Sequence, residues 1–122
     1  MAGQRRKVGY AVVGLGHIAQ VAVLPAFAHA GKNSRLVALV SGDRRKREVL
    51  GKRYRVRAWD YRDLDECLDS PEVDAVYICL PNSMHKESAV RAARAGVHVL
   101  CEKPMATTGA DCEAMICVCR EA

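Results

Sequence analysis

The sequence predicts an α/β fold, a doubly wound parallel sheet of about five strands. Two observations predict it. Short apolar runs recur along the 122 residues, and a segment with charged composition or helical spacing separates each run from the next. A glycine-rich turn also follows the first run, where a parallel strand would pass into a helix. Because strands and helices alternate throughout, the strands should be parallel and joined by right-handed crossovers.

The expected strands are apolar runs that stop at glycine, proline or polar residues, as strands buried on both faces do. They span residues 8–13, 36–40, 55–58, 75–80 and 97–101. The expected helices span residues 17–30, 43–52, 61–68, 83–95 and 108–121. Pro25 should kink or reset the first helix, because proline has no N–H to donate. Gly96 is a natural cap for the fourth helix.

Length and composition indicate a single soluble globular domain over residues 1–122. Hydrophobic residues make up 50% of the chain and charged residues 27%, which excludes disordered and collagen-like classes. The formal net charge of +5 favours anionic ligands. Nucleic acid is a disfavoured ligand, because the basic clusters lie at the expected ligand end or on helix surfaces, without an aromatic platform. No uninterrupted apolar run is long enough to predict a membrane span.

The six cysteines are expected to be reduced and without metal. Cys79 and Cys101 fall inside apolar runs, where cysteine behaves as a small hydrophobe. Cys112, Cys117 and Cys119 lie in an expected helix without a C-x-x-C pair or a matching histidine pair. A cytoplasmic setting follows. A signal peptide is the less favoured alternative, because its cleavage would remove the first strand and the glycine turn.

The glycine-rich turn has the form G-x-G-x-x-A between a strand and a helix, which predicts a Rossmann-type site for a dinucleotide. Gly14 permits the tight turn, Gly16 lets a pyrophosphate approach the backbone, and Ala19 lets the helix pack closely. The helix start supplies free N–H groups for phosphate. For the side chain of His17, a solvent-facing or backbone-bonded position is favoured. The remaining turn residues assigned to the cofactor site are Leu15, His17 and Ile18.

Cofactor choice should be decided at the tip of the second strand, where NAD-binding folds place an acid on the ribose 2′-hydroxyl. Here Ser41 occupies the tip, and Asp43 lies two residues beyond it, followed by cations at 44–46. A small hydroxyl with nearby cations suits a 2′-phosphate, which favours NADP over NAD. The alternative is a solvated helix face with Asp43 as its N-cap. The residues assigned here are Ser41, Gly42, Arg44 and Lys46.

Polar residues follow the fourth strand at the same sheet edge. Leu80 and Pro81 end the strand, Asn82 could bond a ribose or the nicotinamide side of the cofactor, and His85 starts the next helix facing the same crevice. All four are assigned to the cofactor site. The alternative is an ordinary strand-to-helix turn with Asn82 or Ser83 as the cap.

The tripeptide Glu102-Lys103-Pro104 directly follows the last apolar run. A parallel strand would deliver Lys103 to the ligand crevice, where a lysine can become a proton donor if neighbouring charge and burial lower its pKa. A plain structural lysine is the alternative at this position.

Three motifs together resemble the Gfo/Idh/MocA oxidoreductase family, over about residues 6–120. They are G-x-G-x-x-A at 14–19, L-P-N-x-x-H at 80–85 and C-E-K-P-M-A at 101–106. Residues 40–46, 75–78 and 105–107 are most similar to the glucose-fructose oxidoreductase branch. The resemblance implies that Lys103 is the catalytic lysine, polarising or protonating a sugar oxygen. It also implies that Glu102 lies near the nicotinamide ribose and that Ser41 and Lys46 contact the 2′-phosphate.

The resemblance further implies a hydride transfer between nicotinamide and a sugar or polyol carbon. Family members carry a second α/β domain that builds the sugar pocket, and this domain is expected to be absent from residues 1–122. We therefore expect cofactor binding without full catalysis by this chain alone. The alternative hypothesis is a non-catalytic dinucleotide-binding or regulatory module that acts through a partner. For this alternative, the free edge of the fifth strand favours self-association or the docking of another chain.

Overall fold

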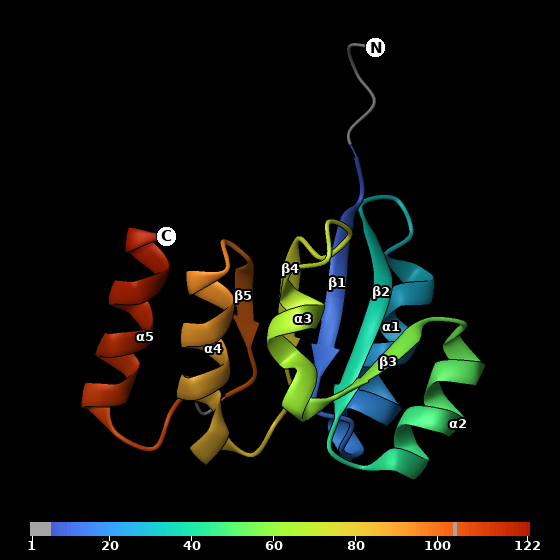
Figure 1. The fold of residues 1–122 in the computed structure, drawn as a ribbon, viewed down its shortest axis with the longest axis horizontal. Coiled ribbons are helices and arrows are strands. Elements are labelled where there is room, and N and C mark those ends of the chain that lie inside the picture. Colours follow the sequence, from blue (N-terminus) through green and yellow to red (C-terminus); the bar gives the residue numbers. More distant parts are fainter. Residues whose placement is uncertain (1–5, 104) are drawn as a thin grey trace.

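The computed structural model describes residues 6–103 and 105–122 and consists of one parallel sheet with helices on both faces (Figure 1). The strand order is β3-β2-β1-β4-β5, and every neighbouring pair is parallel. The strands are β1 (Val8–Val13), β2 (Ser34–Ser41), β3 (Arg57–Asp60), β4 (Ala75–Ile78) and β5 (His98–Cys101). The predicted doubly wound fold is confirmed, and the strand order reverses direction at β1, beside β4. In such sheets ligands bind outside the carboxyl ends of the strands at this switch point.

The longer helices are α2 (Arg44–Tyr54), α4 (His85–Arg94) and α5 (Gly109–Glu121). The shorter segments are η1 (Ala19–Val23), α1 (Leu24–Ala26), η2 (Phe27–His29), η3 (Tyr61–Asp63), α3 (Leu64–Leu68) and η4 (Asn82–Met84). Figure 1 places α1 and α2 behind the sheet and α3 and α4 in front of it. Within the described residues, every helix is too short or too polar to cross a lipid bilayer.

The first helical segment changes its winding twice, as the sequence predicts for a helix that contains Pro25. It begins as a π-helical turn, in which the N–H of Leu24 donates to the carbonyl of Ala19. It then forms one α-helical turn and ends as a 3₁₀ helix. Pro25 has no N–H to donate to the carbonyl of Val21, so the regular i to i−4 ladder cannot pass through this point.

The third strand begins two residues later than the sequence predicts. Arg55 closes α2 with a left-handed backbone, at φ 56°, and its N–H donates to the carbonyls of Gly51 and Lys52. A residue in this conformation cannot extend a strand, so β3 starts at Arg57. The expected strand over 55–58 is therefore wrong in its start.

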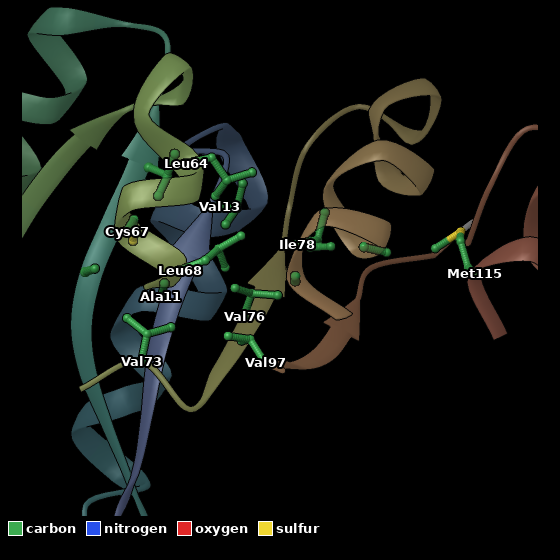
Figure 2. Packing of buried hydrophobic residues seen from close by; sticks show 14 residues of the cluster. Ala11, Val13, Leu64, Cys67, Leu68, Val73, Val76, Ile78, Val97 and Met115 are labelled. Atoms are coloured by element: carbon green, nitrogen blue, oxygen red, sulfur yellow. The ribbon is translucent and has the colours of Figure 1, made fainter. Parts of the chain in front are cut away.

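Two apolar clusters hold the helices on the sheet, one on each face. Alternation along β1 sends Ala11 and Val13 to one face and Val12 to the other, and all three are buried. The first cluster lies under α3 and α4 (Figure 2) and contains the side chains of Leu64, Cys67, Val76, Ile78 and Val97, among others. The second lies under η1, α1 and α2 and contains Leu15, Leu24, Leu39 and Leu50. Because both faces of the sheet are covered around β1, its carboxyl end is held rigidly.

The last helix, α5, packs on α4 at the outer side of the sheet (Figure 1). Met115 is its buried residue, and the ion pair between Lys86 and Asp111, at 3.2 Å, joins the two helices. A groove of about 440 Å³ is left between β5 and α5. Leu100 in β5 is 48% exposed, because it lies at a sheet edge that pairs with no further strand in the described residues.

Candidate cofactor site

The sheet register brings the four predicted segments to one edge. Val13 pairs with Val40 and with Ile78, and Ile78 pairs with Cys101. These paired residues lie side by side at the ends of their strands. Four segments follow them within two residues: the glycine turn, the Ser41 tip, the Leu80 turn and Glu102. Segments that are far apart in the sequence therefore surround one crevice at the carboxyl ends of β1, β2, β4 and β5.

Gly14 is required by the backbone of the protein itself. Its φ of +97° lies in the left-handed region, and its N–H donates to the carbonyl of Val40 at 2.8 Å. A Cβ added here would lie 2.8 Å from the backbone nitrogen of Leu80, closer than real Cβ contacts allow. Gly14 thus allows β1 to turn while the β4 turn lies directly against it.

Gly16 has a different environment. A Cβ added there meets nothing within 4 Å in the described part of the chain outside its own neighbours. The carbonyl of Gly16 accepts the first helical bond, from the N–H of Gln20 at 3.2 Å. The surface over Gly16 is therefore open to a ligand, at the start of a helix, where backbone N–H groups point outward.

The other turn residues separate into buried and exposed side chains. Ala19 is fully buried against the sheet, as expected for close helix packing. The side chain of Leu15 is also buried, so this residue can reach a ligand only through its backbone. His17 is exposed, in agreement with the favoured solvent-facing position. Ile18 is 44% exposed and lines a groove of about 300 Å³ that also contains Glu102.

The tip of β2 is organised by the start of α2. Ser41 is buried, and its Oγ accepts from the N–H of Asp43 at 3.0 Å. A carboxylate oxygen of Asp43 accepts from the N–H of Lys46 at 3.0 Å, so Asp43 is the N-cap of α2. The alternative role considered for Asp43 is thereby confirmed, and one of its carboxylate oxygens is engaged by the protein.

Cations surround this tip. Lys46 is half-buried and, with Arg45, Asp43 and Gln20, lines a groove of about 270 Å³ between η1 and α2. Arg44 points into solvent and pairs with Glu48 at 3.1 Å. The geometry therefore offers Lys46 and Arg45 to an anion in this groove at the start of α2, whereas Arg44 lies outside it.

Sequence reasoning missed the structural role of Arg47. Its Nη1 donates to the carbonyl of Ser41 at 2.9 Å and pairs with Asp60 at 3.3 Å. The side chain is only 18% exposed, unlike those of the neighbouring cations. A signal was present, because Arg47 precedes the buried Leu50 by three residues and therefore shares its helix face.

The residues of the turn after β4 differ in their exposure to solvent. Pro81 and Asn82 are exposed at the crevice, and α4 begins without a side-chain cap hydrogen bond among the described residues. The capping alternative for Asn82 or Ser83 is therefore not what the structure shows. Gly14 approaches the backbone of Leu80 from β1, which keeps this turn beside the glycine turn.

His85 does not face the crevice, which corrects the expected position of its side chain. It is 1% exposed, with Nε2 at 2.6 Å from the carbonyl oxygen of Leu80 and Nδ1 at 3.1 Å from that of Met105. The imidazole is buried because α4 begins on the sheet side of the turn. It ties the turn after β4 to the segment that follows Lys103, and any effect on a cofactor would be indirect.

Glu102 and Lys103 point to different sides of the β5 end. The N–H of Glu102 donates to the carbonyl of Ile78 at 3.0 Å, which continues the ladder between β4 and β5. The Glu102 carboxylate accepts from the hydroxyl of Tyr77 at 2.5 Å. Lys103 is exposed and lines the groove beside α5, whereas Glu102 lines the groove beside η1. Pro104 lies outside the described residues.

The cysteines are free thiols in this structure. Burial raises the pKa of Cys67 to about 11 and that of Cys79 to about 12. Cys117 and Cys119 are exposed on α5. Over residues 6–103 and 105–122, no cluster of three or more His, Cys, Asp or Glu side chains could hold a metal ion.

Several solved structures share the fold of this chain. The aldose-aldose oxidoreductase from Caulobacter crescentus is 49% identical over 95% of this chain, with a TM-score of 0.91. The WlbA dehydrogenase from Bordetella pertussis, in complex with NADH, is 29% identical over 95% of the chain, with a TM-score of 0.87. The 3-ketoreductase KijD10 from Actinomadura kijaniata, in complex with NADP, is 32% identical over 95% of the chain, with a TM-score of 0.85. This chain covers 35% of the length of each of them.

The family assignment follows from these similarities. Residues 8–122 match the model of the oxidoreductase family with an NAD-binding Rossmann fold, GFO_IDH_MocA. The similarity to an aldose-aldose oxidoreductase is consistent with the glucose-fructose oxidoreductase branch. The motifs at the crevice and the whole-chain match agree, and the chain belongs to the Gfo/Idh/MocA oxidoreductase family.

Proposed function

We propose that this chain is the NADP-binding domain of a sugar-type oxidoreductase. One observation carries the proposal: the register of the sheet gathers the open Gly16 turn, the cationic Ser41 tip, Asn82 and Glu102 around one crevice. Only a long, phosphate-bearing ligand would use all of these groups at once. Relatives with the same fold were solved with NADH and with NADP.

The residues at the crevice fit three parts of such a cofactor: the pyrophosphate, the 2′-phosphate and the nicotinamide side. The pyrophosphate would lie over Gly16, where the helix N–H groups are available and no side chain intrudes. The 2′-phosphate would lie at Ser41, Lys46 and Arg45. Asn82 and Glu102 would hold the nicotinamide side, because both follow strands on the other side of the switch point.

NADP is proposed over NAD because the carboxylates of Asp43 and Asp60, near the β2 tip, already bond protein groups. One oxygen of Asp43 caps α2, and Asp60, the register partner of Ser41, pairs with Arg47. The hydroxyl of Ser41 bonds the N–H of Asp43, and Lys46 lines the groove at the start of α2 together with Asp43 and Arg45. A 2′-phosphate would pair with the cations and would not be repelled by a free acid.

Lys103 is proposed to handle the proton of the substrate. The bound nicotinamide would supply or take a hydride at a sugar or polyol carbon. In the reducing direction the ammonium group of Lys103 would give a proton to the carbonyl oxygen, and in the oxidising direction its neutral amine would take the proton of the hydroxyl. In this chain Lys103 is exposed beside β5. Because the chain covers about a third of its solved relatives, the substrate pocket is proposed to come from further residues. This chain alone would bind cofactor without full catalysis.

A second function, a non-catalytic dinucleotide-binding module acting through a partner, is favoured by the exposed apolar edge at Leu100. The two proposals differ in turnover when a substrate domain is supplied, which only the first predicts. A cytoplasmic location is proposed for both, with the free thiols as support.

The test of cofactor binding is a titration of the purified chain with NADPH and with NADH, followed by the fluorescence of the nicotinamide. We expect saturation by both and tighter binding of NADPH. Lys46→Ala should lose about three- to tenfold of NADPH affinity and little of NADH affinity, because one charge-assisted contact is removed. Lys52→Ala, an exposed cation at the far end of α2, is the matched control. If neither cofactor saturates at millimolar concentration, the proposal is wrong.

A further inference from the structure

We propose that Tyr77 is a positioning residue that holds the Glu102 carboxylate toward the nicotinamide ribose. Tyr77 lies in β4 and is not among the residues that the sequence assigns to the cofactor site. The inference rests on the proposed function, because the role of Glu102 toward the ribose belongs to that function.

The sheet register determines that these two side chains meet. Tyr77 in β4 pairs with Leu100 in β5, and Glu102 lies two residues beyond Leu100. Because side chains alternate along a strand, Leu100 and Glu102 project from the same face of the sheet, which is also the face of Tyr77. The Tyr77 ring reaches toward the carboxyl edge, and its hydroxyl donates to Oε1 of Glu102 at 2.5 Å.

The hydrogen bond between Tyr77 and Glu102 lies in a largely apolar groove. Tyr77 and Glu102 line the groove of about 300 Å³ beside η1, together with apolar side chains such as Ile18, Ala22 and Leu100. A carboxylate beside apolar side chains loses hydrogen bonds to water. A hydrogen-bond donor from the protein compensates for this loss. The hydrogen bond to Glu102 is the main cause that raises the pKa of Tyr77 to about 12, with burial as the second cause. The hydroxyl therefore remains a donor at every pH at which the protein would work.

The hydrogen bond also orders the Glu102 side chain. A glutamate at a strand end has three rotatable bonds, and a ligand that binds it must otherwise pay for fixing them. Tyr77 holds Oε1, and we assign Oε2 to a ribose hydroxyl. Ile18 of the glycine turn lines the same groove, so the held carboxylate shares a groove with that turn.

The inference is tested with two ligands that differ in their nicotinamide half. NADPH reaches Glu102, whereas adenosine 2′,5′-bisphosphate carries only the adenine and 2′-phosphate side. Tyr77→Phe keeps the ring and removes the hydroxyl, so it should fold with a nearly unchanged thermal midpoint. We expect it to weaken the binding of NADPH about three- to tenfold, because the ligand must then order the Glu102 side chain itself, and to leave the binding of the bisphosphate unchanged.

Two further variants assign the effect to Glu102. Glu102→Ala should weaken NADPH as well, and adding Tyr77→Phe to it should have no further effect, because the partner is already gone. Tyr10→Phe is the matched control, since Tyr10 lines the same groove and its ring packs edge-on against Phe27, at 5.5 Å between centroids. It should leave the affinity for NADPH unchanged.

The outcomes distinguish the positioning role of Tyr77 from cofactor binding by the chain. Three results would overturn the positioning role while cofactor binding stands. Tyr77→Phe could leave the affinity for NADPH unchanged, lower the affinities for both ligands equally, or still lower the affinity for NADPH in the Glu102→Ala background. If the unchanged protein binds neither ligand, the proposed function fails, and the positioning role fails with it.

Discussion

The Nε2 atom of His85 lies 2.6 Å from the carbonyl oxygen of Leu80, where β4 passes into α4. The other ring nitrogen lies 3.1 Å from the carbonyl oxygen of Met105. One buried imidazole therefore holds two segments of the crevice, and neither would have a fixed position relative to the other through backbone pairing alone.

Removal of this imidazole should destabilise the protein. For His85→Ala we expect a loss of about 2–4 kcal/mol in the free energy of unfolding, because the contacts of a buried ring with the carbonyls of Leu80 and Met105 are lost and a cavity forms. Urea denaturation measures it. His29→Ala, at an exposed histidine, should change stability by no more than about 0.5 kcal/mol. Equal stabilities of the His85 and His29 variants would contradict the role assigned to His85.

The two glycines of the turn should respond in opposite ways to alanine. Gly14→Ala should cost about 2–4 kcal/mol of stability, because its backbone is left-handed and the new Cβ would meet Leu80. Gly16→Ala should fold normally, because its Cβ meets nothing, but should bind NADPH at least about tenfold more weakly if the pyrophosphate lies there. Denaturation and titration of both variants check the contrast. A Gly16→Ala variant with full affinity would place the pyrophosphate elsewhere.

Arg47 should affect cofactor preference without touching the cofactor. Arg47→Met removes the donor to the carbonyl of Ser41, so the β2 tip should lose its fixed position, and NADPH should be weakened about threefold or more relative to NADH. Arg62→Met is the control, because Arg62 also pairs with Asp60, at 3.4 Å, but is exposed. If the two variants weaken NADPH equally, the contact to Ser41 is not what matters.

Stability should fall at alkaline pH. The ordinary pKa is 9.0 for the cysteines and 10.0 for tyrosine, but in the folded chain it is about 11 for Cys67 and about 12 for Cys79 and Tyr77. From pH 9 upward the unfolded chain releases these protons while the folded chain keeps them, so the free energy of unfolding decreases up to about pH 12. Urea denaturation at several pH values measures the decline, which Cys79→Ala should make shallower. A constant stability from pH 9 to 11 would contradict these pKa values.

The free edge of β5 should make the chain self-associate at high concentration. Leu100 is 48% exposed on this edge, and an unpaired edge strand offers backbone groups to a second copy. Leu100→Lys should lower the average mass in light scattering, because a charge on an edge strand opposes pairing. Val49→Lys, at an apolar side chain exposed on α2, is the control. A monomer at all concentrations would exclude this edge as an interface of the chain with itself.

The order of elements and the four crevice segments could be predicted from local pattern. Apolar runs identified each strand, and the spacing of Gly14, Gly16 and Ala19 identified the turn. Strand boundaries were less certain, because Arg55 carries no residue-type signal for its left-handed backbone. The partners of Arg47, Tyr77 and His85 could not be found from pattern, because each contacts a residue that another element supplies. For Arg47 the pattern indicated only the buried face of its helix.

The sequence by itself determined the fold class, the family and the glycine turn, since these depend on short-range periodicity and on motifs within a few residues. Only the tertiary structure decided which side chains of the motifs face the crevice. Leu15 and His85 were turned inward by packing, Asp43 was engaged as a helix cap, and Glu102 received its donor from the neighbouring strand. Side-chain direction depends on register and burial, and both arise from contacts between residues that are distant in the sequence.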